Sequence, residues 1–308
     1  MLASGCARLA RDDAVLLDAP ALEAAVAALE LRADAALVVA AADIAHCDQL
    51  ERAAATAALA AAVVAATREA AVITMGDHAY EKGTREEFAQ CYEPTWGRLN
   101  AVTYPSPGNH DFETDDGAPY YDYFAHYRRD PAARERGYYA FEIGGWQLLA
   151  LNSLLPLEAG SAQLSWLEAE LGRASGRCTL AYWHHPLASS GWHGLWPLDR
   201  GRDTRDAWRA LLAHRAELVV NGHEHVYERY APMSAELERD PDGLRQFIVG
   251  TGGGKLKPVL RRRAGSELVW NRTHGILVLV LHPDGYEWAF IGTDGVVRDR
   301  SDSVRPCR

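Results

Sequence analysis

Three apolar runs in the first third of the chain each lead into side chains that can hold a metal ion or a phosphate group. These runs, each with the polar residues after it, are residues 36–42 with Asp43, residues 71–75 with Gly76-Asp77, and residues 101–104 with Asn109-His110-Asp111. Such runs predict buried strands, and the alanine-rich residues 48–66, with Asp48 as N-cap, predict a helix after the first. This alternation predicts an α/β fold, in which ligands bind beyond the carboxyl ends of the strands.

The segment 105–111 allows two interpretations from its residues alone. Asn109 offers a carbonyl oxygen, His110 offers a nitrogen ligand or a proton, and Asp111 can hold that imidazole in one tautomer. On a tight turn after a strand, these groups indicate a metal or phosphate site. The alternative is a polar turn that only caps the strand, so the rest of the chain has to decide.

The later chain repeats the pattern of a strand followed by ligands. Residues 178–183 lead to His184-His185, and residues 218–221 lead to Gly222-His223-Glu224-His225. The other predicted elements are a hairpin of residues 138–143 and 147–152, helices at 161–171 (N-cap Ser161) and 203–214, a loop at 112–137, and strands at 246–249, 276–281 and 287–291. The order is alternating α/β first and β-rich later.

Five predicted strand ends therefore present metal-ligand chemistry, and five of the 12 histidines fall at them. A helix cap or a core histidine could explain each alone, but the joint pattern favours one shared site. Asp77 and Tyr80 are three residues apart, so one turn can aim both at one ion. His223 and His225 alternate on an extended segment and face the same side. Two ions would need a bridging carboxylate, for which Asp77 is suited, and ions about 3.5–4 Å apart form the clamp used for displacement at phosphorus.

With these residues in order, the sequence resembles the calcineurin-like metallophosphoesterase superfamily over about residues 36–308. Within it, Gly76-Asp77-His78-Ala79-Tyr80 resembles the purple acid phosphatase branch, because Ala45 replaces the usual metal-binding His of the first block and Tyr80 supplies the tyrosine of that branch. Residues 92–97 and 189–194 resemble a bacterial secreted subgroup. The resemblance implies an α/β sandwich of two mixed β-sheets flanked by helices, with residues 35–308 as the catalytic domain.

The resemblance also implies roles for individual residues. The first metal would be bound by Asp43, Tyr80 and His225, the second by Asn109, His184 and His223, and Asp77 would bridge them. Of the remaining residues, His110 would contact the substrate phosphate and Asp111 would orient His110. His185 would lie behind the metal ligands, and His193 would lie near the leaving group. Two positions depart from the pattern of the branch: Ala42 replaces a Gly, and Asp111 stands where Glu is usual. His46 is predicted to be structural, and His78 either supports the ligands or is exposed.

The ligand sets predict different ions. Two carboxylates and a phenolate suit a hard trivalent ion such as iron(III) at the first position, whereas two imidazoles and an amide oxygen suit a divalent ion such as zinc, manganese or iron(II) at the second. The implied activity is hydrolysis of phosphate monoesters by attack of a metal-bound hydroxide. The alternatives are a phosphodiesterase or nucleotidase on the same site and a non-catalytic binding protein with this fold.

Composition restricts partners and location. The net charge of −10 argues against a nucleic-acid binder that relies on a basic surface. The partner that the family resemblance implies is a small-molecule phosphate ester. No apolar run is long enough to predict a membrane span. The positions of the five cysteines predict the pairs Cys47–Cys91 and Cys178–Cys307 and an extracytoplasmic, oxidising compartment, with reduced buried thiols as the alternative.

Residues 1–34 are predicted to be an N-terminal tether or processing remnant, with a short helix at 20–32. Residues 2–6 resemble the end of a bacterial lipoprotein signal, which makes Cys6 a candidate lipid anchor. The basic and apolar regions that normally precede such a signal are missing, so a chance match is the alternative.

Overall fold

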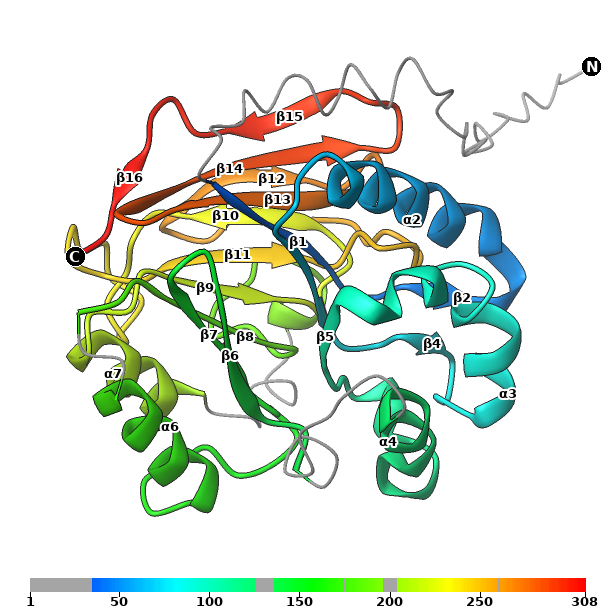
Figure 1. Ribbon diagram of the computed structural model, residues 1–308, viewed down its shortest axis with the longest axis horizontal. Coiled ribbons are helices and arrows are strands. Elements are labelled where there is room, and N and C mark those ends of the chain that lie inside the picture. Colours follow the sequence, from blue (N-terminus) through cyan, green and yellow to red (C-terminus); the bar gives the residue numbers. More distant parts are fainter. Residues whose placement is uncertain (1–34, 126–135, 174–175, 196–203, 260) are drawn as a thin grey trace, which may run out of the picture.

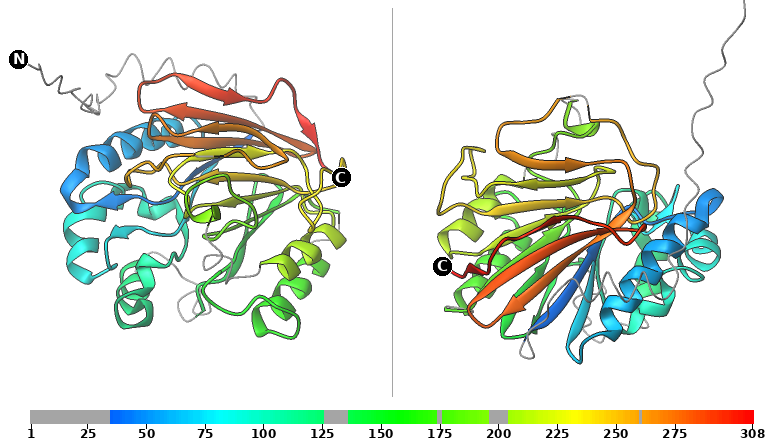
Figure 2. Two further views of the ribbon diagram at one scale, coloured as in Figure 1. Left: turned by 180° about the vertical axis from the view of Figure 1, so that it is seen from behind. Right: turned by 90° about the horizontal axis from the view of Figure 1, so that it is seen from above.

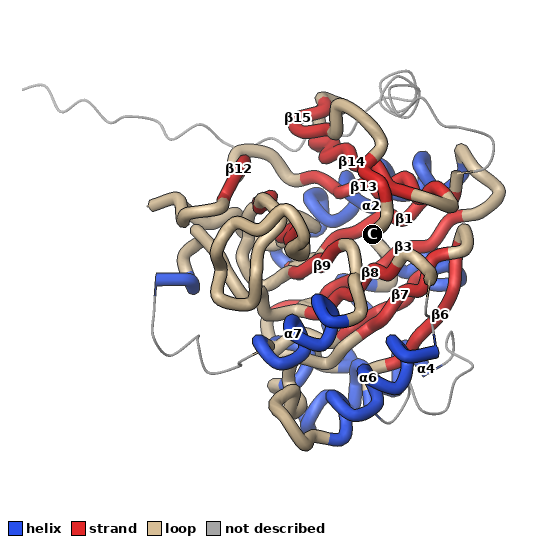
Figure 3. The backbone as a smooth tube through the Cα atoms, turned by 90° about the vertical axis from the view of Figure 1, so that its left-hand side faces the viewer, coloured by secondary structure: helices blue, strands red, loops and turns tan. Residues whose placement is uncertain are grey.

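The computed structural model describes residues 35–125, 136–173, 176–195, 204–259 and 261–308. Two mixed β-sheets pack face to face and are flanked by helices, which confirms the predicted fold class (Figures 1 and 3). The expectations for residues 1–34, including the helix at 20–32 and the lipid anchor at Cys6, lie outside the described residues. No helix among the described residues has the length and apolar character that crossing a bilayer requires.

The first sheet has the strand order β15-β14-β13-β1-β3-β5, with β16 paired to β14. Its strands are β1 (Ala36–Ala41), β3 (Ala70–Met75), β5 (Thr103–Ser106), β13 (Gly275–His282), β14 (Gly285–Gly292), β15 (Val297–Arg300) and β16 (Arg305–Pro306). β1, β3 and β5 are parallel, whereas β13 and β14 are antiparallel to their neighbours. The carboxyl ends of β1, β3 and β5 therefore meet at one edge.

The second sheet has the order β12-β10-β11-β9-β8-β7-β6. Its strands are β6 (Tyr139–Ile143), β7 (Trp146–Ala150), β8 (Thr179–Trp183), β9 (Leu218–Asn221), β10 (Tyr227–Tyr230), β11 (Arg245–Val249) and β12 (Ser266–Trp270). β7, β8, β9 and β11 are parallel. A two-stranded ribbon, β2 (Ala45–His46) with β4 (Ala79–Tyr80), lies beside the first sheet and carries Tyr80.

The helices cover the outer faces of the sandwich. They are α2 (Leu50–Ala65) with the short α3 (Arg85–Glu87) and α4 (Ala118–Ala125) on the side of the first sheet, and α6 (Ala162–Arg173) and α7 (Arg205–Ala213) on the second (Figure 2). The remaining turns are 3-10 helices at Cys47–Gln49, Gly97–Val102, His110–Phe112, Asp115–Gly117 and His193–Leu195 and a π-helix at Phe88–Tyr92. Strand β1 is buried on both faces, because Val38 packs between the sheets and Leu37 packs with α2, as its continuous apolar run predicts.

Several predicted boundaries differ from the structure. The strand expected at 101–104 begins at Thr103 and includes Pro105, which is tolerated because β5 is the last strand in its sheet and needs no second ladder bond. The segment expected as a loop at 112–137 contains helix α4, in which Tyr120 and Phe124, four residues apart, bury the same face. Asp48 does not cap α2, since it lies in a preceding 3-10 turn and Gln49 is the cap residue. The predicted N-cap Ser161 is confirmed, because its Oγ accepts the backbone N–H of Leu164.

Both predicted disulfides are present. Cys47 pairs with Cys91, and Cys178 pairs with Cys307. The first ties the turn after β2 to the π-helix, and the second ties the start of β8 to the end of the chain. The predicted pairing is therefore confirmed, and it indicates an oxidising compartment.

Candidate metal centre

Five strands end at one edge of the sandwich, and the residues after them form the candidate centre. Asp43 follows β1, Asp77 follows β3 and His223 follows β9, and each has a positive φ, of 58°, 53° and 70°. Non-glycine residues seldom adopt this conformation, and they concentrate at functional sites. The turns place these side chains directly over the strand ends, together with Asn109 beyond β5 and His184 after β8.

Glycines let the turns approach one another. A Cβ on Gly108 would lie 2.2 Å from Asp77 Oδ1, and a Cβ on Gly222 would lie 2.4 Å from the Cβ of Ala42. Only a residue without a side chain fits at these contacts. The close approach of these turns, within the first sheet at Gly108 and between the sheets at Gly222, therefore depends on glycine.

The first group of ligand atoms surrounds the hydroxyl of Tyr80. This oxygen lies 2.9 Å from Asp43 Oδ1, 3.2 Å from Asp77 Oδ2 and 3.2 Å from His225 Nε2. His225 Nε2 is also 3.3 Å from Asp43 Oδ1. The Nδ1 of His225 faces the carbonyl of Lys255 at 2.8 Å, which holds the proton there and leaves the Nε2 lone pair directed at the group.

The second group centres on Asn109. Its Oδ1 lies 3.0 Å from His184 Nε2 and 3.1 Å from His223 Nδ1, and the two nitrogens are 3.2 Å apart. The Nδ1 of His184 faces the carbonyl of Met75 at 2.6 Å, which fixes the tautomer as in the first group. Asp77 Oδ2 is 3.4 Å from His184 Nε2, so this one carboxylate touches both groups.

These distances fit metal coordination. Ligand atoms about 2.0–2.2 Å from an ion lie about 2.9–3.5 Å from one another in tetrahedral or octahedral geometry. Both groups fall within that range, and Asp43, Asp77 and His184 offer three ligand atoms within 4.8 Å of one another. The first group is rich in oxygen and the second in nitrogen, so the donor sets fit a hard ion and a borderline ion respectively.

Burial and charge act against each other in the metal-free centre. Burial alone would raise the pKa of Asp77, but the neighbouring His184 outweighs it and lowers that pKa. Burial likewise lowers the pKa of His184, but Asp77 raises it to about 9. Burial, and then the Asp43 carboxylate, raise the pKa of Tyr80 well above its ordinary value. In the metal-free centre Asp77 and His184 therefore each favour the charged form of the other, and a bound cation would replace the proton of His184.

His110 lies beside the bridging carboxylate and is partly exposed. Its side chain is 31% exposed, and its Nε2 lies 4.0 Å from Asp77 Oδ2. Its Nδ1 faces the Glu81 carbonyl at 2.5 Å and Glu113 Oε1 at 3.3 Å. The ring is therefore oriented by the segment after Tyr80 and by its own helical turn.

The contacts of the Asp111 carboxylate join two turns of the centre. The Asp111 carboxylate accepts the backbone N–H groups of Asp77, His78 and Gly108 and faces the His78 ring at 2.8 Å. These four partners lie on the turns after β3 and β5, and the His110 ring is held by other groups. Both Asp111 and His78 are fully buried, so His78 is not exposed. This pair locks the turn that carries the bridging carboxylate to the turn that carries Asn109.

His185 and His193 both lie beside His223. The His185 ring centroid is 4.5 Å from that of His223, and its Nδ1 faces Ser153 Oγ at 2.9 Å, so it lies behind the second group. The His193 ring stacks on His223 at 4.5 Å and is 29% exposed. Glu224, which sequence reasoning did not single out, contacts His193. Its place between two ligands was the available signal, but alternation does not explain its position, because residues 223–226 form bends and His223 has a positive φ.

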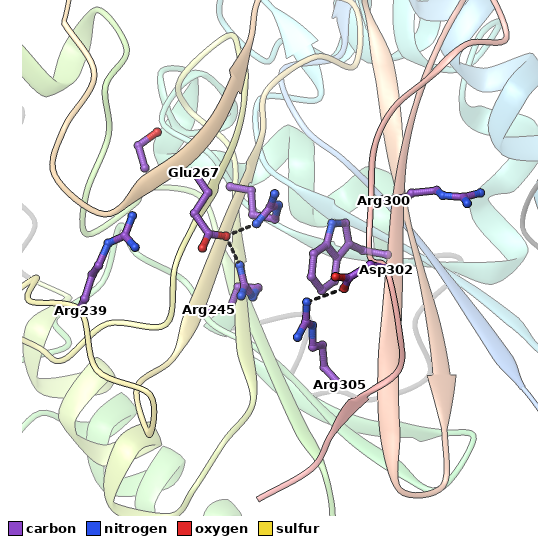
Figure 4. Close-up of a pocket in the computed structure, with 9 residues that line it drawn as sticks. Arg239, Arg245, Glu267, Arg300, Asp302 and Arg305 are labelled. Atoms are coloured by element: carbon purple, nitrogen blue, oxygen red, sulfur yellow. Dashed lines mark hydrogen bonds and ion pairs between the residues drawn. The ribbon is translucent and has the colours of Figure 1, made fainter.

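An arginine-rich cavity of about 510 Å³ lies between β10, β11, β12 and the C-terminal strands (Figure 4). Most of its charges pair with one another: Glu267 binds Arg229 and Arg245, and Asp302 binds Arg305. Three of its guanidinium groups also lie over the ring of Trp288. We interpret these side chains as an ion-pair network that fills the open end of the sandwich, away from the ligand groups.

The fold and the ligand set define an α/β sandwich whose strand ends carry a candidate metal-binding centre. The family model of the calcineurin-like phosphoesterases matches residues 22–227, and the chain belongs to this family.

Known relatives are consistent with the predicted branch. Purple acid phosphatase 21 of Arabidopsis thaliana is 29% identical over 192 residues, covering 56% of this chain and 43% of that protein. A probable cyclic nucleotide phosphodiesterase of Psychrobacter is 26% identical over 172 residues, covering 52% and 49%. A purple acid phosphatase from yellow lupin seeds has the same fold, with a TM-score of 0.70, 17% identity, and coverage of 87% of this chain and 53% of that one. The chain spans about half the length of the relatives it matches.

Proposed function

We propose that this protein hydrolyses phosphate monoesters at a centre that holds two metal ions. The observation that carries the proposal is the convergence of seven ligand residues into two groups that share Asp77 Oδ2, which lies 3.2 Å from Tyr80 Oη and 3.4 Å from His184 Nε2. A carboxylate shared in this way is what a pair of ions about 3.5–4 Å apart needs. The relationship to purple acid phosphatases supports the monoester class.

Asp43, Tyr80 and His225 would hold iron(III), and Asn109, His184 and His223 would hold a divalent ion such as zinc, manganese or iron(II). When bound, the two ions neutralise the charge of the phosphoryl group and make water a competent nucleophile near neutral pH. The protein's own groups then orient the ester. His110, which is 31% exposed, would bind a phosphoryl oxygen, and His193, which is 29% exposed, would donate a proton to the leaving alcohol.

Metal analysis with a visible spectrum tests the ligand assignment. The Tyr80 phenolate on iron(III) should give a charge-transfer band together with about two metal equivalents per chain. Tyr80→Phe is the matched variant, because it keeps the ring and removes only the ligand oxygen. A band that persists in this variant, or a colourless wild-type protein that holds only zinc or calcium, would refute the iron assignment.

A panel of aryl phosphate monoesters and diesters tests the substrate class. We expect turnover of monoesters to exceed that of diesters. The relationship to a probable cyclic nucleotide phosphodiesterase supports the alternative, and dominant diester hydrolysis would establish it. Asn109→Ala should abolish turnover with little effect on folding, since its side chain serves the second ligand group; an unchanged rate would favour a non-catalytic protein.

The two disulfides support an extracytoplasmic location, which we propose together with the bacterial secreted subgroup. Of the five cysteines, only Cys6 stays outside these pairs. Titration of the denatured, unreduced protein should therefore find at most one free thiol. Four or more free thiols would refute both the pairing and the proposed compartment.

A further inference from the structure

Two buried carboxylates hold the loop of residues 189–194, which carries His193. Glu224 accepts the backbone N–H of Gly194 at 2.7 Å and that of His193 at 3.3 Å. Glu228 accepts the backbone N–H of Ser190 at 2.9 Å and its hydroxyl at 2.5 Å. Both side chains are almost fully buried, with exposed fractions of 1% and 0%. A buried carboxylate is stable only where donors surround it, so both are built into the loop.

The two carboxylates contact different side chains of the loop. Nδ1 of His193 lies 3.6 Å from Glu224 Oε2, whereas Glu228 binds the loop through Ser190. The fit around Glu224 is close, since a Cβ on Gly191 would lie 2.2 Å from its Oε2. The His193 ring is held on its other side by stacking on His223. Contacts with Glu224 and with His223 therefore position the His193 ring from two sides.

We infer that Glu224 is a positioning residue that acts through His193. Its carboxylate attracts the protonated Nδ1 side of the His193 ring across 3.6 Å and thereby favours the orientation in which Nε2 faces away from Glu224. This inference rests on the proposed function, in which His193 serves the leaving group. As the phosphorus–oxygen bond breaks, the alcohol oxygen keeps the bonding pair and takes the proton of His193. The proton that the attacking water loses then restores the imidazole.

The leaving group supplies a test that loop stability alone would not affect. An alcohol of high pKa needs its proton in the transition state, whereas p-nitrophenol leaves almost unaided. Glu224→Gln should slow phenyl phosphate about 10–100-fold but p-nitrophenyl phosphate by less than about threefold. His193→Ala should show the same selectivity, and the double variant should lose little more, because the two residues act as a unit.

Glu228→Gln is the matched control, because it loosens the same loop at Ser190 rather than at His193. It should change the rates for both esters by the same small factor. Gly191→Ala is a second probe, since its Cβ displaces the Glu224 carboxylate without removing the charge, and it should reproduce the selectivity of Glu224→Gln. Metal content and far-ultraviolet circular dichroism establish that each variant is folded and loaded.

The outcomes separate this inference from the proposed function. A leaving-group-dependent loss in Glu224→Gln and Gly191→Ala, with an unchanged ester ratio in Glu228→Gln, supports the positioning role. An equal loss for both esters in Glu224→Gln, or a ratio change matched by Glu228→Gln, refutes it while leaving the phosphatase proposal intact. A wild-type protein that hydrolyses no monoester refutes the proposed function itself.

Discussion

Substituting Gly108 by alanine tests whether the shared position of Asp77 creates the metal centre. The substitution removes no ligand, and the backbone of Gly108 lies outside the left-handed region, so alanine meets no conformational barrier there. The added Cβ would lie 2.2 Å from Asp77 Oδ1 and 2.4 Å from the Asp77 backbone nitrogen. Non-bonded atoms prefer separations of about 3.5 Å or more, so the Asp77 turn has to move by about 1 Å.

A displacement of this size exceeds what metal coordination tolerates, but it is small enough for the fold to accommodate. Coordination distances tolerate about 0.2 Å, and a misplacement of about 1 Å costs about 100-fold in catalysis. Overpacking of this kind destabilises a protein by about 1–3 kcal/mol. We therefore expect Gly108→Ala to stay folded, to lose at least one metal equivalent and to lose about 100-fold in kcat/KM toward p-nitrophenyl phosphate.

Gly172→Ala in helix α6 is the matched control. Nothing lies within 4 Å of the Cβ that it adds, and alanine in a helix is more stable than glycine by about 1 kcal/mol. Its activity and metal content should equal those of the wild type. If Gly108→Ala retains two metal equivalents and a kcat/KM within about threefold of wild type, the bridging assignment of Asp77 is wrong.

Three further predictions concern stability. Replacing Cys47 and Cys91 by alanine opens a link across 44 residues, for which the loop-entropy relation gives about 4 kcal/mol; a denaturant titration that shows less than about 1 kcal/mol would contradict it. In the metal-free protein, His184 has a pKa of about 9, above its ordinary 6.5, because Asp77 outweighs burial. The pair therefore stabilises the metal-free fold fully below pH 6.5 and progressively less up to about pH 9, and unfolding midpoints should fall over that window in wild type but stay flat in His184→Asn. Finally, His78→Ala should cost about 3–5 kcal/mol, because it leaves the buried Asp111 without its ring partner, whereas His46→Ala, with a side chain 25% exposed, should cost under about 1 kcal/mol; equal losses would show that burial of the pair is unimportant.

Much of this protein can be predicted from sequence because the relevant signals are local. The apolar runs before Asp43 and Asp77 fix strands that are buried on both faces, and their lengths agree with β1 and β3 to within a residue. The apolar run before His223 likewise marks a strand end, but the extended segment predicted for His223 and His225 is wrong, because these residues lie in bends and His223 has a positive φ. Side-chain chemistry and apolar runs of this kind require no knowledge of what packs against the strand.

Tertiary structure alone decided which distant groups meet. Asp111 follows His110 directly, yet its carboxylate pairs with His78, 33 residues earlier, because the turns after β3 and β5 lie side by side. In the sequence Glu224 only separates two ligands. The fold brings the loop of residues 189–194 against it, and this gives Glu224 a partner in His193, 31 residues earlier in the chain. The residue types and their strand-end positions are thus determined locally, whereas the partner of each buried polar group depends on close packing between segments far apart in sequence.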